Sequence, residues 1–512
     1  MYALSGTWIA NPINNDFNTP ANWSSNSVPG PLDIATFEGS DITDISISAN
    51  SGVDTLFLQS GASAYRFTAL PGIAMYVFDG GITNLSGVEQ NFIAQTDSAG
   101  QSGVFVMDLF GGIFGDGVVF TEYGAKFPGI NGGAAFFSGD SNAGTASFRN
   151  LGGTVSGAAG GLVVFESRCD AGASTIINEG GEVSGAAGGT TIFQIADPSA
   201  ANATIIANGG SVSGAGGGLI SFYNSSQGGD STLIANGGSN GGGGGAIFFR
   251  DSSDGGKAQV EVFGNGSLDV TLSSERSIAV GSIEGDGMVV LAANELTVGA
   301  NGQSTVFSGL ISDATGPGGS IVKTGPGTLT LTRANAYLGG TTVQRGSLVA
   351  TNSSGSATGT GAVSVTSGTL GGSGIIAGVV TVGTGSGGGA FLAPAHGGNK
   401  QLTLSIRGSL TFNSDATYTY TFKAKGNRSK IDKVVANGVT INSGATINLS
   451  GTTQGPLTQG TTLTVIKNTA ATPITGNFSN LPDGEIVNVN GNNLQASYSG
   501  GDGNDLTLAV VP

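Results

Sequence analysis

Between about Thr145 and Ser267 the sequence repeats itself roughly every 28 residues, and this repeat limits the possible folds more than any other feature. Each copy holds two short β-type runs separated by a glycine-rich turn. One copy is too short to bury its own apolar face, whereas stacked copies share a continuous core. The repeat therefore predicts an all-β, right-handed parallel β-solenoid (β-helix) with coils of about 28 residues. A phenylalanine recurs once per copy, at Phe137, Phe165, Phe193, Phe222 and Phe249.

The composition agrees with short strands and tight turns. Glycine supplies 93 of the 512 residues, and charged residues supply only 10%. Glycine adopts positive φ without steric cost, which suits sharp corners. The strict three-residue period of collagen is absent, and the recurring aliphatic and aromatic positions argue against disorder. Paired glycines mark the same turn in each copy, at Gly152-Gly153, Gly180-Gly181, Gly209-Gly210 and Gly237-Gly238.

Stacking the copies arranges the aliphatic residues in two neighbouring columns. Strand faces alternate, so a slip of one residue would exchange the two columns, and the sequence leaves open which one points inward. The phenylalanine column is expected to be core rather than a surface for stacking ligands. The first aliphatic column holds Ile176, Ile205 and Leu233, and the second holds Ile177, Ile206, Ile234 and Val262.

We expect four segments along the chain. Residues 1–40 hold Trp8 and Trp23 and predict an N-terminal cap over the open apolar end of the solenoid; a ligand-binding tryptophan pair is the alternative. The glycine-rich solenoid follows over residues 41–300. Residues 301–399 and 400–512 carry different patterns, the second with strict strand alternation.

The third segment contains a series of short motifs. They are Lys323-Thr-Gly-Pro-Gly-Thr-Leu-Thr-Leu331, Asn335-Ala-Tyr337, Gly339-Gly-Thr-Thr-Val343 and Gly346-Ser-Leu348. In order and spacing this series resembles the autotransporter-associated β-strand repeat, and residues 400–512 resemble the C-terminal part of such passengers. The resemblance implies an exported solenoid in the extracellular space or on a bacterial cell surface, often structural or adhesive. Autotransporters end in a membrane β-barrel, which we do not expect within these residues.

Charge and targeting patterns narrow the function classes. The formal charge is −16 and the 18 basic residues are scattered, so nucleic acid binding is not expected. The start of the chain lacks the basic and apolar regions of a signal peptide, so we expect the numbering to begin after a removed leader. The sequence contains no run of 18 or more apolar residues, so no membrane helix is expected. Cys169 is the only cysteine, either a reactive thiol or, as we favour, a small buried or loop residue.

Two patterns typical of nucleophilic catalysis are weak. Gly237-Gly238-Ser239-Asn240-Gly241 fits a nucleophile elbow, but it lies among glycines without a strand–turn–helix context. A serine nucleophile also needs a base, and the single histidine, His396, lies in a predicted loop. We therefore expect no catalytic triad. Glycine strings such as GAAGG lack the lysine and helix of a phosphate-binding loop.

Carboxylates near the turns after the phenylalanine column are the remaining catalytic candidates. Paired-carboxylate hydrolysis needs two carboxyl groups roughly 5 to 9 Å apart. Residues one or two coils apart in a solenoid have about this separation, because neighbouring coils are spaced at about 4.8 Å. Acids in exposed turns are also ordinary solubilising residues, and we assign no catalytic, cofactor or metal site. The candidates are Glu166, Asp170, Asp197, Asp230, Asp251 and Asp254.

The C-terminal end carries two further patterns. Gly500-Gly501-Asp502-Gly503-Asn504-Asp505 resembles the start of a calcium-binding β-roll repeat, but a single copy cannot enclose calcium, and we interpret it as a turn before a strand. That strand, DLTLAVVP, is apolar rather than a polar cap. It predicts a head-to-tail contact with the N-terminal region of another copy, and hence filaments.

These observations favour a non-enzymatic extracellular or cell-surface structural solenoid, either a fibre or filament subunit or an adhesive stalk. The alternative is a carbohydrate-binding or polysaccharide-cleaving β-helix. Possible partners are further copies of the chain and glycans or cell surfaces of hosts or neighbours. No cofactor is expected.

Overall fold

The computed structural model describes residues 5–108, 110–313, 318–396, 401–425, 428–453 and 456–512. It divides into two compact units, Met1–Gly281 and Ser282–Pro512. Met1 and the expected boundary at residues 399 and 400 lie outside the described residues. The described chain is almost entirely β, with one short 3-10 turn, η1 (Pro20–Asn22). None of its helical segments has the length and apolar character needed to cross a membrane.

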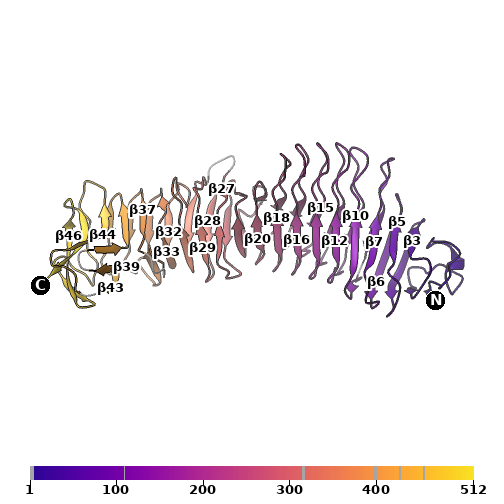
Figure 1. The fold of residues 1–512 in the computed structure, drawn as a ribbon, viewed down its shortest axis with the longest axis horizontal. Helices are drawn as coiled ribbons and strands as arrows, with labels where there is room; N and C mark the ends of the chain where they lie inside the picture. The colour runs from indigo at the N-terminus through magenta and orange to yellow at the C-terminus, as the bar shows by residue number, and fades with distance from the viewer. Residues whose placement is uncertain (1–4, 109, 314–317, 397–400, 426–427, 454–455) are drawn as a thin grey trace. The chain divides into compact units, whose positions relative to one another are not determined.

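The first unit is a parallel β-solenoid in which successive coils add strands to two sheets (Figure 1). This confirms the predicted fold class. Sheet 1 contains β1 (Gly6–Thr7), β2 (Ile34–Phe37), β4 (Ser51–Leu58), β6 (Ala74–Asn84), β8 (Val104–Met107), β11 (Ala134–Phe137), β13 (Leu162–Glu166), β15 (Thr190–Gln194), β17 (Leu219–Phe222), β19 (Ala246–Phe249) and β21 (Ser267–Asp269), with β9 (Ile113–Phe114) paired to β6. Sheet 2 contains β3 (Asp44–Ile47), β5 (Arg66–Ala69), β7 (Gln90–Ala94), β10 (Val118–Glu122), β12 (Ser147–Asn150), β14 (Thr175–Asn178), β16 (Thr204–Ala207), β18 (Thr232–Ala235) and β20 (Gln259–Val262). The next strand in the unit, β22 (Ser277–Val280), belongs to neither sheet.

The repeat period fixes the register between coils. Phe193 pairs with Phe165 on one side and Phe222 on the other. The three rings are fully buried and stack at centroid distances of 4.8 and 4.7 Å. The phenylalanine column is therefore core, as predicted.

The two aliphatic columns are now assigned to faces. Ile176, Ile205 and Leu233 are fully buried, whereas Ile177 and Ile206 point outward and are partly exposed. One predicted position is wrong, that of Val262. It pairs with Ala235 and is buried, and Glu261 stands opposite Ile234 instead. Thr232 pairs with Gln259, so this coil is one residue shorter than its predecessor, and a shift of one residue moves a side chain to the other face.

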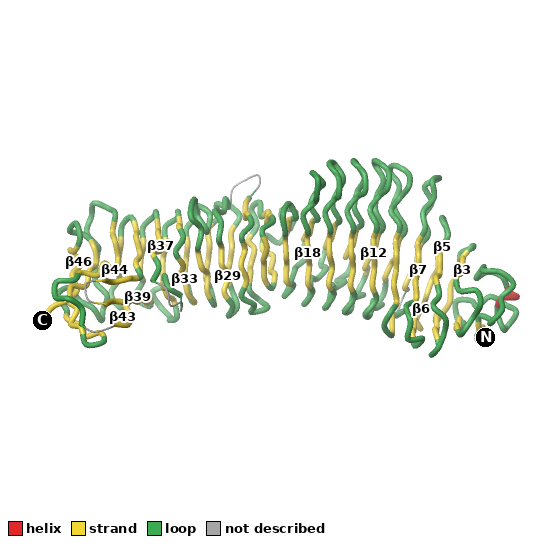
Figure 2. The backbone as a smooth tube through the Cα atoms, in the orientation of Figure 1, coloured by secondary structure: helices red, strands yellow, loops and turns green. Residues whose placement is uncertain are grey.

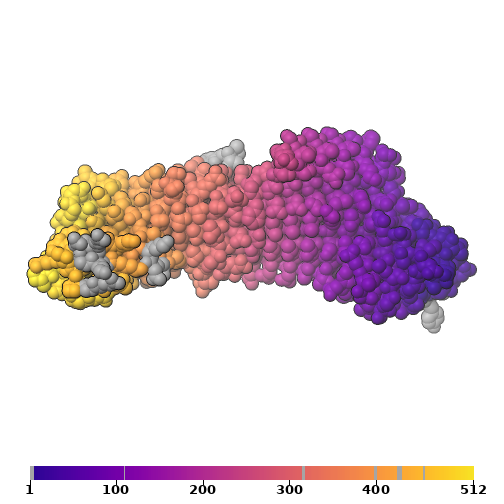
Figure 3. Space-filling model, viewed as in Figure 1, coloured from indigo at the N-terminus to yellow at the C-terminus, as the bar shows by residue number. Residues whose placement is uncertain are grey.

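Four glycine-rich loops lead from sheet 2 to sheet 1, and we call them the glycine ridge: residues 151–161, 179–189, 208–218 and 236–245. They rise from one edge of the first unit (Figure 2) and close into a continuous surface (Figure 3). A Cβ on Gly153 or Gly181 would lie 2.5 or 2.4 Å from a carbonyl oxygen in the other arm of its own loop. Only glycine allows the two arms to meet. The Gly157 N–H then donates to the Gly185 carbonyl at 2.8 Å, so the ladder between coils continues into the ridge.

The tryptophans of the N-terminal segment are core residues. Trp8 and Trp23 are 1% and 2% exposed, with ring centroids 5.4 Å apart. The Trp23 indole N–H donates to the Phe17 carbonyl at 2.8 Å, and the Trp23 ring also packs edge-on against Phe37. The rings cover one another and are not displayed to a ligand.

The second unit is built of further sheets, whose strands are mostly parallel. One contains β23 (Ser282–Gly285), β26 (Thr305–Phe307), β29 (Thr328–Leu331), β31 (Ser347–Ala350), β33 (Gly368–Gly372), β36 (Ala390–Ala393), β39 (Ala416–Lys425) and β43 (Thr446–Thr453), with β40 (Arg428–Ile431) antiparallel to β39. Another contains β25 (Glu295–Val298), β28 (Ser320–Lys323), β30 (Gly340–Val343), β32 (Val363–Val365), β35 (Val380–Val382), β38 (Leu410–Phe412) and β42 (Val439–Ile441), and β24 (Met288–Val290) pairs with β27 (Leu310–Ser312). The last contains β34 (Ile375–Ile376), β37 (Thr403–Ile406), β41 (Lys433–Ala436), β44 (Thr462–Asn468), β47 (Asp505–Val511), β46 (Asn492–Gly500) and β45 (Ile486–Val489).

The prediction that the C-terminal strand forms an uncapped end is wrong. β47 lies between β44 and β46 and pairs antiparallel with both. Its backbone groups are therefore used within the chain, and its apolar residues Leu506 and Leu508 are fully buried. The chain folds back on itself, which alternation in the sequence alone does not distinguish from a further parallel strand.

Replacing Ile205 by Asp should destabilise the first unit strongly. The new carboxylate would be buried in an apolar column without a partner, at a cost of at least about 3 kcal/mol. Thermal unfolding followed by circular dichroism measures the effect. Ile206→Asp is the matched control, because its side chain points outward. Equal melting of the two variants would contradict the assignment of faces.

Candidate functional site

The six candidate carboxylates lie at or near turns of the first unit. Glu166 accepts a hydrogen bond from the Gln194 amide at 2.7 Å, and Asp170 accepts from the Gly172 N–H at 2.7 Å. Asp254 accepts from the Ala279 N–H at 2.6 Å. These bonds hold turns or join coils.

The other three are placed similarly. Asp251 accepts from the Asn224 N–H at 3.1 Å, Asp230 lies 3.9 Å from the Lys257 Nζ, and Asp197 is exposed with φ 66°. Within the described ranges, the hydrogen bonds and ion pairs of the six go to amides, backbone N–H groups and one lysine. The structure thus gives each of them a local partner or a turn position.

The residues considered for nucleophilic catalysis belong to different elements of the chain. Ser239 is in the glycine ridge, where the chain runs from strand to strand, and its Oγ donates to the Ser211 carbonyl at 3.3 Å. His396 is in the second unit, in a turn after β36, and burial lowers its pKa. Cys169 is fully buried, and burial raises the pKa of its thiol to about 12. A thiol in that state is a poor nucleophile, so the buried-residue interpretation of Cys169 is confirmed.

The glycine- and aspartate-rich pattern near the C-terminus is a hairpin turn. Gly500 pairs with Asp505 where β46 meets β47, and the Asp505 carboxylate accepts from the Asn468 N–H at 2.9 Å. The predicted turn is therefore confirmed. Over the part of the chain that the structure describes, no three His, Cys, Asp or Glu side chains are grouped so as to hold a metal ion.

A row of polar side chains on the outer face of sheet 1 was not predicted. Each member directly follows a buried residue of the inner column, and three neighbouring pairs interact, Asp108 with Ser138, Glu166 with Gln194 and Tyr223 with Arg250. Ser138 Oγ donates to Asp108 Oδ1 at 2.7 Å, and the Arg250 Cζ lies 5.4 Å from the centre of the Tyr223 ring. The sequence signal is the residue after each repeated phenylalanine. The row, which we call the outer row, consists of Asp108, Ser138, Glu166, Gln194, Tyr223 and Arg250.

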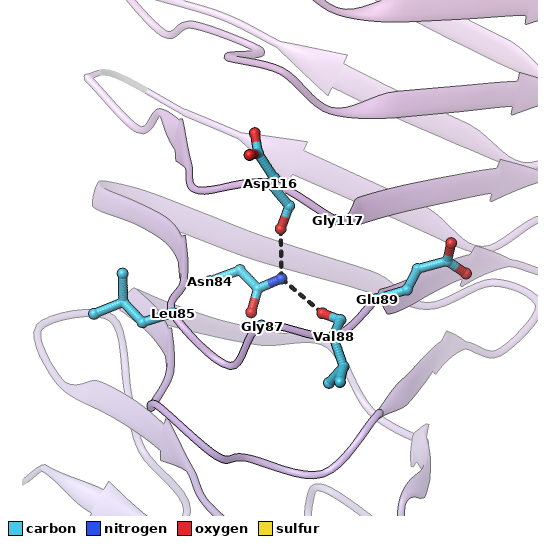
Figure 4. A pocket seen from close by; sticks show the side chains of 7 residues that line it. All are labelled: Asn84, Leu85, Gly87, Val88, Glu89, Asp116 and Gly117. Atoms are coloured by element: carbon cyan, nitrogen blue, oxygen red, sulfur yellow. Dashed lines mark hydrogen bonds between the residues drawn. The ribbon is translucent and has the colours of Figure 1, made fainter.

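A pocket of about 440 Å³ opens between two loops of the first unit (Figure 4). The Asn84 amide closes its base by donating to the carbonyls of Val88 at 3.1 Å and Asp116 at 2.7 Å. The Glu89 carboxylate accepts from Asn91 at 3.1 Å, and that of Asp116 accepts from Thr145 at 2.9 Å. The lining residues are Asn84, Leu85, Gly87, Val88, Glu89, Asp116 and Gly117.

A buried polar ladder crosses sheet 2. Glu122 pairs with Asn150, and Asn150 with Asn178. Both amide hydrogens of Asn150 are used, by the Asn178 Oδ1 at 2.6 Å and the Thr190 carbonyl at 3.1 Å. The Asn150 Oδ1 and both Glu122 carboxyl oxygens are buried without a partner, and burial raises the pKa of Glu122 well above its usual range. Only the protonated carboxyl has a hydrogen to donate to such an acceptor.

In the second unit, buried polar side chains join neighbouring coils. The Asn335 Oδ1 accepts from the Ile311 N–H at 2.8 Å, and its Nδ2 donates to the Ala357 carbonyl at 2.6 Å. The Lys323 Nζ donates to the carbonyls of Gly325 and Arg345 at 3.0 and 3.3 Å, while burial lowers its pKa to about 8. These side chains satisfy backbone groups that the turns leave unpaired.

Part of the chain is similar to known proteins. Residues 321–350 match the family model of the passenger-associated-transport-repeat. The chain is also similar to the adhesin BmaC autotransporter of Brucella suis biovar 1 (strain 1330), at 43% identity over 101 residues. The chain is autotransporter passenger-like. The aligned part is 19% of this passenger-like chain and 3% of that adhesin, so only a small fraction of the adhesin is represented.

Glu122→Gln should stabilise the first unit at pH 7.5 by on the order of 1–3 kcal/mol, because the neutral amide removes the cost of desolvating or protonating the buried carboxylate. The pKa of Glu122 is higher in the folded than in the unfolded protein. The protonated carboxyl therefore contributes its full stability below the unfolded pKa, and the parent loses that stability as pH rises through the folded pKa. Thermal unfolding from pH 4 to 8 tests this, with a small difference expected at pH 4. Glu182→Gln, at an exposed ridge position, is the control. Parallel pH profiles of Glu122→Gln and the parent would refute the assignment.

Proposed function

We propose that this chain is a surface-exposed adhesive solenoid, exported to a bacterial cell surface and acting by binding. The observation that carries the proposal is the similarity to an autotransporter adhesin together with the passenger-associated-transport-repeat. Adhesion suits the geometry. A parallel solenoid displays equivalent outward positions at about 4.8 Å intervals, and repeated weak contacts add up through multivalency.

Binding without catalysis is part of the same proposal. Five of the six candidate carboxylates are engaged within the fold, by turn or inter-coil hydrogen bonds or near Lys257, and the Cys169 thiol is buried. A carbohydrate-binding or polysaccharide-cleaving β-helix is the second candidate. Of these two activities the outer row favours carbohydrate binding, because acid, amide and aromatic side chains stand side by side there.

Assembly into filaments is a separate proposal, and the edge strand β45 now carries it. Within the described residues β45 pairs only with β46, and its Ile486 is 52% exposed. An exposed strand edge is a template for pairing with another chain. We expect the particle size from light scattering to grow with protein concentration and to grow less for Ile486→Lys. A parent that stays monomeric at high concentration would refute filament formation.

The adhesive function is tested with beads coated with the purified chain. They should bind to cultured cells or extracellular matrix at least about tenfold more than beads coated with an unrelated acidic β-protein, because multivalent display multiplies weak contacts. The same protein should not cleave pectin or alginate. Coated beads that adhere no better than the control would refute adhesion, and glycan cleavage would favour the enzymatic alternative.

A further inference from the structure

We propose that the outer face of sheet 1 binds the carboxylate of an acidic sugar at Arg250. The proposal rests on the adhesive function above and specifies its ligand. Arg250 follows β19 at one end of the outer row, beside the rings of Tyr223 and Phe248.

The backbone of Arg250 is fixed by its turn. Its N–H donates to the Ser253 Oγ at 2.9 Å, and that hydroxyl donates to the Arg250 carbonyl at 2.7 Å. The same Oγ lies 3.2 Å from the Phe222 carbonyl in the preceding coil. The side chain therefore starts from a defined position, which reduces the entropy lost when a ligand binds.

The guanidinium is held by rings and not by an acid. Its Cζ lies 4.5 Å from the centre of the Phe248 ring and 5.4 Å from that of Tyr223. The Nε is shielded from water and has no hydrogen-bond partner. Ion pairs within the described residues occupy Arg149 and Arg168, whereas Arg250 is not in one. With Nε buried, the two Nη groups of this stacked guanidinium are left for the bidentate recognition of a carboxylate.

The neighbours in the outer row favour a sugar over an acidic peptide. Gln194 and Glu166, two and three coils from Arg250 and joined by a 2.7 Å hydrogen bond, provide donors and acceptors suited to the hydroxyl groups of further sugar units. The parts of the Tyr223 and Phe248 rings that the guanidinium leaves exposed offer an apolar surface beside it for the carbon face of a sugar ring. Glu166, Asp108 and the net charge of −16 would repel a ligand with many carboxylates. One carboxylate among several hydroxyls is the chemistry that fits, as in a terminal sialic or uronic acid.

Titration calorimetry with sialyllactose, a glucuronate disaccharide and lactose tests the site. The parent should bind at least one of the two acids and should bind lactose more weakly. Arg250→Gln should weaken acid binding by about tenfold or more, the loss expected for one charge-assisted hydrogen-bonded contact. Arg149→Gln is the control, an exposed arginine on sheet 2. Unchanged binding by Arg250→Gln, equal binding of lactose, or no binding of either acid by the parent would each overturn the assignment.

Folding and function are separated by two further measurements. Circular dichroism checks that Arg250→Gln is folded; if it is not, Arg250→Lys, which keeps the charge but loses the fork, should still weaken acid binding. The bead assay is run with the parent and the variant. Adhesion that persists in a variant unable to bind acid would overturn this ligand as the adhesive contact and leave adhesion standing. A parent that binds the acids without adhering would leave the site standing and refute adhesion.

Discussion

Hydrogen bonding between parallel strands of successive coils is the interaction on which the rest of the first unit depends. Pairing in register places equivalent residues above one another, and so Phe165, Phe193 and Phe222 form one stack. The same ladder continues into the glycine ridge, where Gly157 donates to the Gly185 carbonyl. It also aligns the outer row, because each of its residues follows the inner column. Loops absorb the differences in coil length, so the pairing register and not a fixed residue count decides which face a side chain takes, as Val262 shows.

Corners are where such a ladder is weakest, since turns leave backbone groups unpaired. In the second unit, buried polar side chains supply the hydrogen-bond partners that these backbone groups lack. Asn335 bonds one coil through the Ile311 N–H and another through the Ala357 carbonyl, and the Lys323 ammonium donates to carbonyls of its own and the next coil. Both residues fall within the passenger-associated-transport-repeat. Within this match, Lys323 and Asn335 are thus polar side chains that connect neighbouring coils.

The period and the phenylalanine column were sufficient to predict the fold, because both follow from the equal spacing of large apolar residues. The inward face was not predictable, since Ile176 and Ile177 are chemically identical neighbours and only packing distinguishes them. The antiparallel β47 was missed because alternating apolar residues suit either strand direction. The Arg250 site joins residues 27 positions apart, Tyr223 and Arg250, and becomes visible only when the register is known.

The outer row shows how such a scaffold separates stability from recognition. The repeated phenylalanine is the same in successive coils, whereas the residue after it changes from Ser138 to Glu166, Gln194, Tyr223 and Arg250. The inner column must stay uniform, because stacked coils share one core and each depends on its neighbours. An outward position carries no such restriction, and its side chain contributes little to folding. Chemically different groups can therefore stand about 4.8 Å apart along one face, which is the arrangement that a ligand with several unlike groups requires.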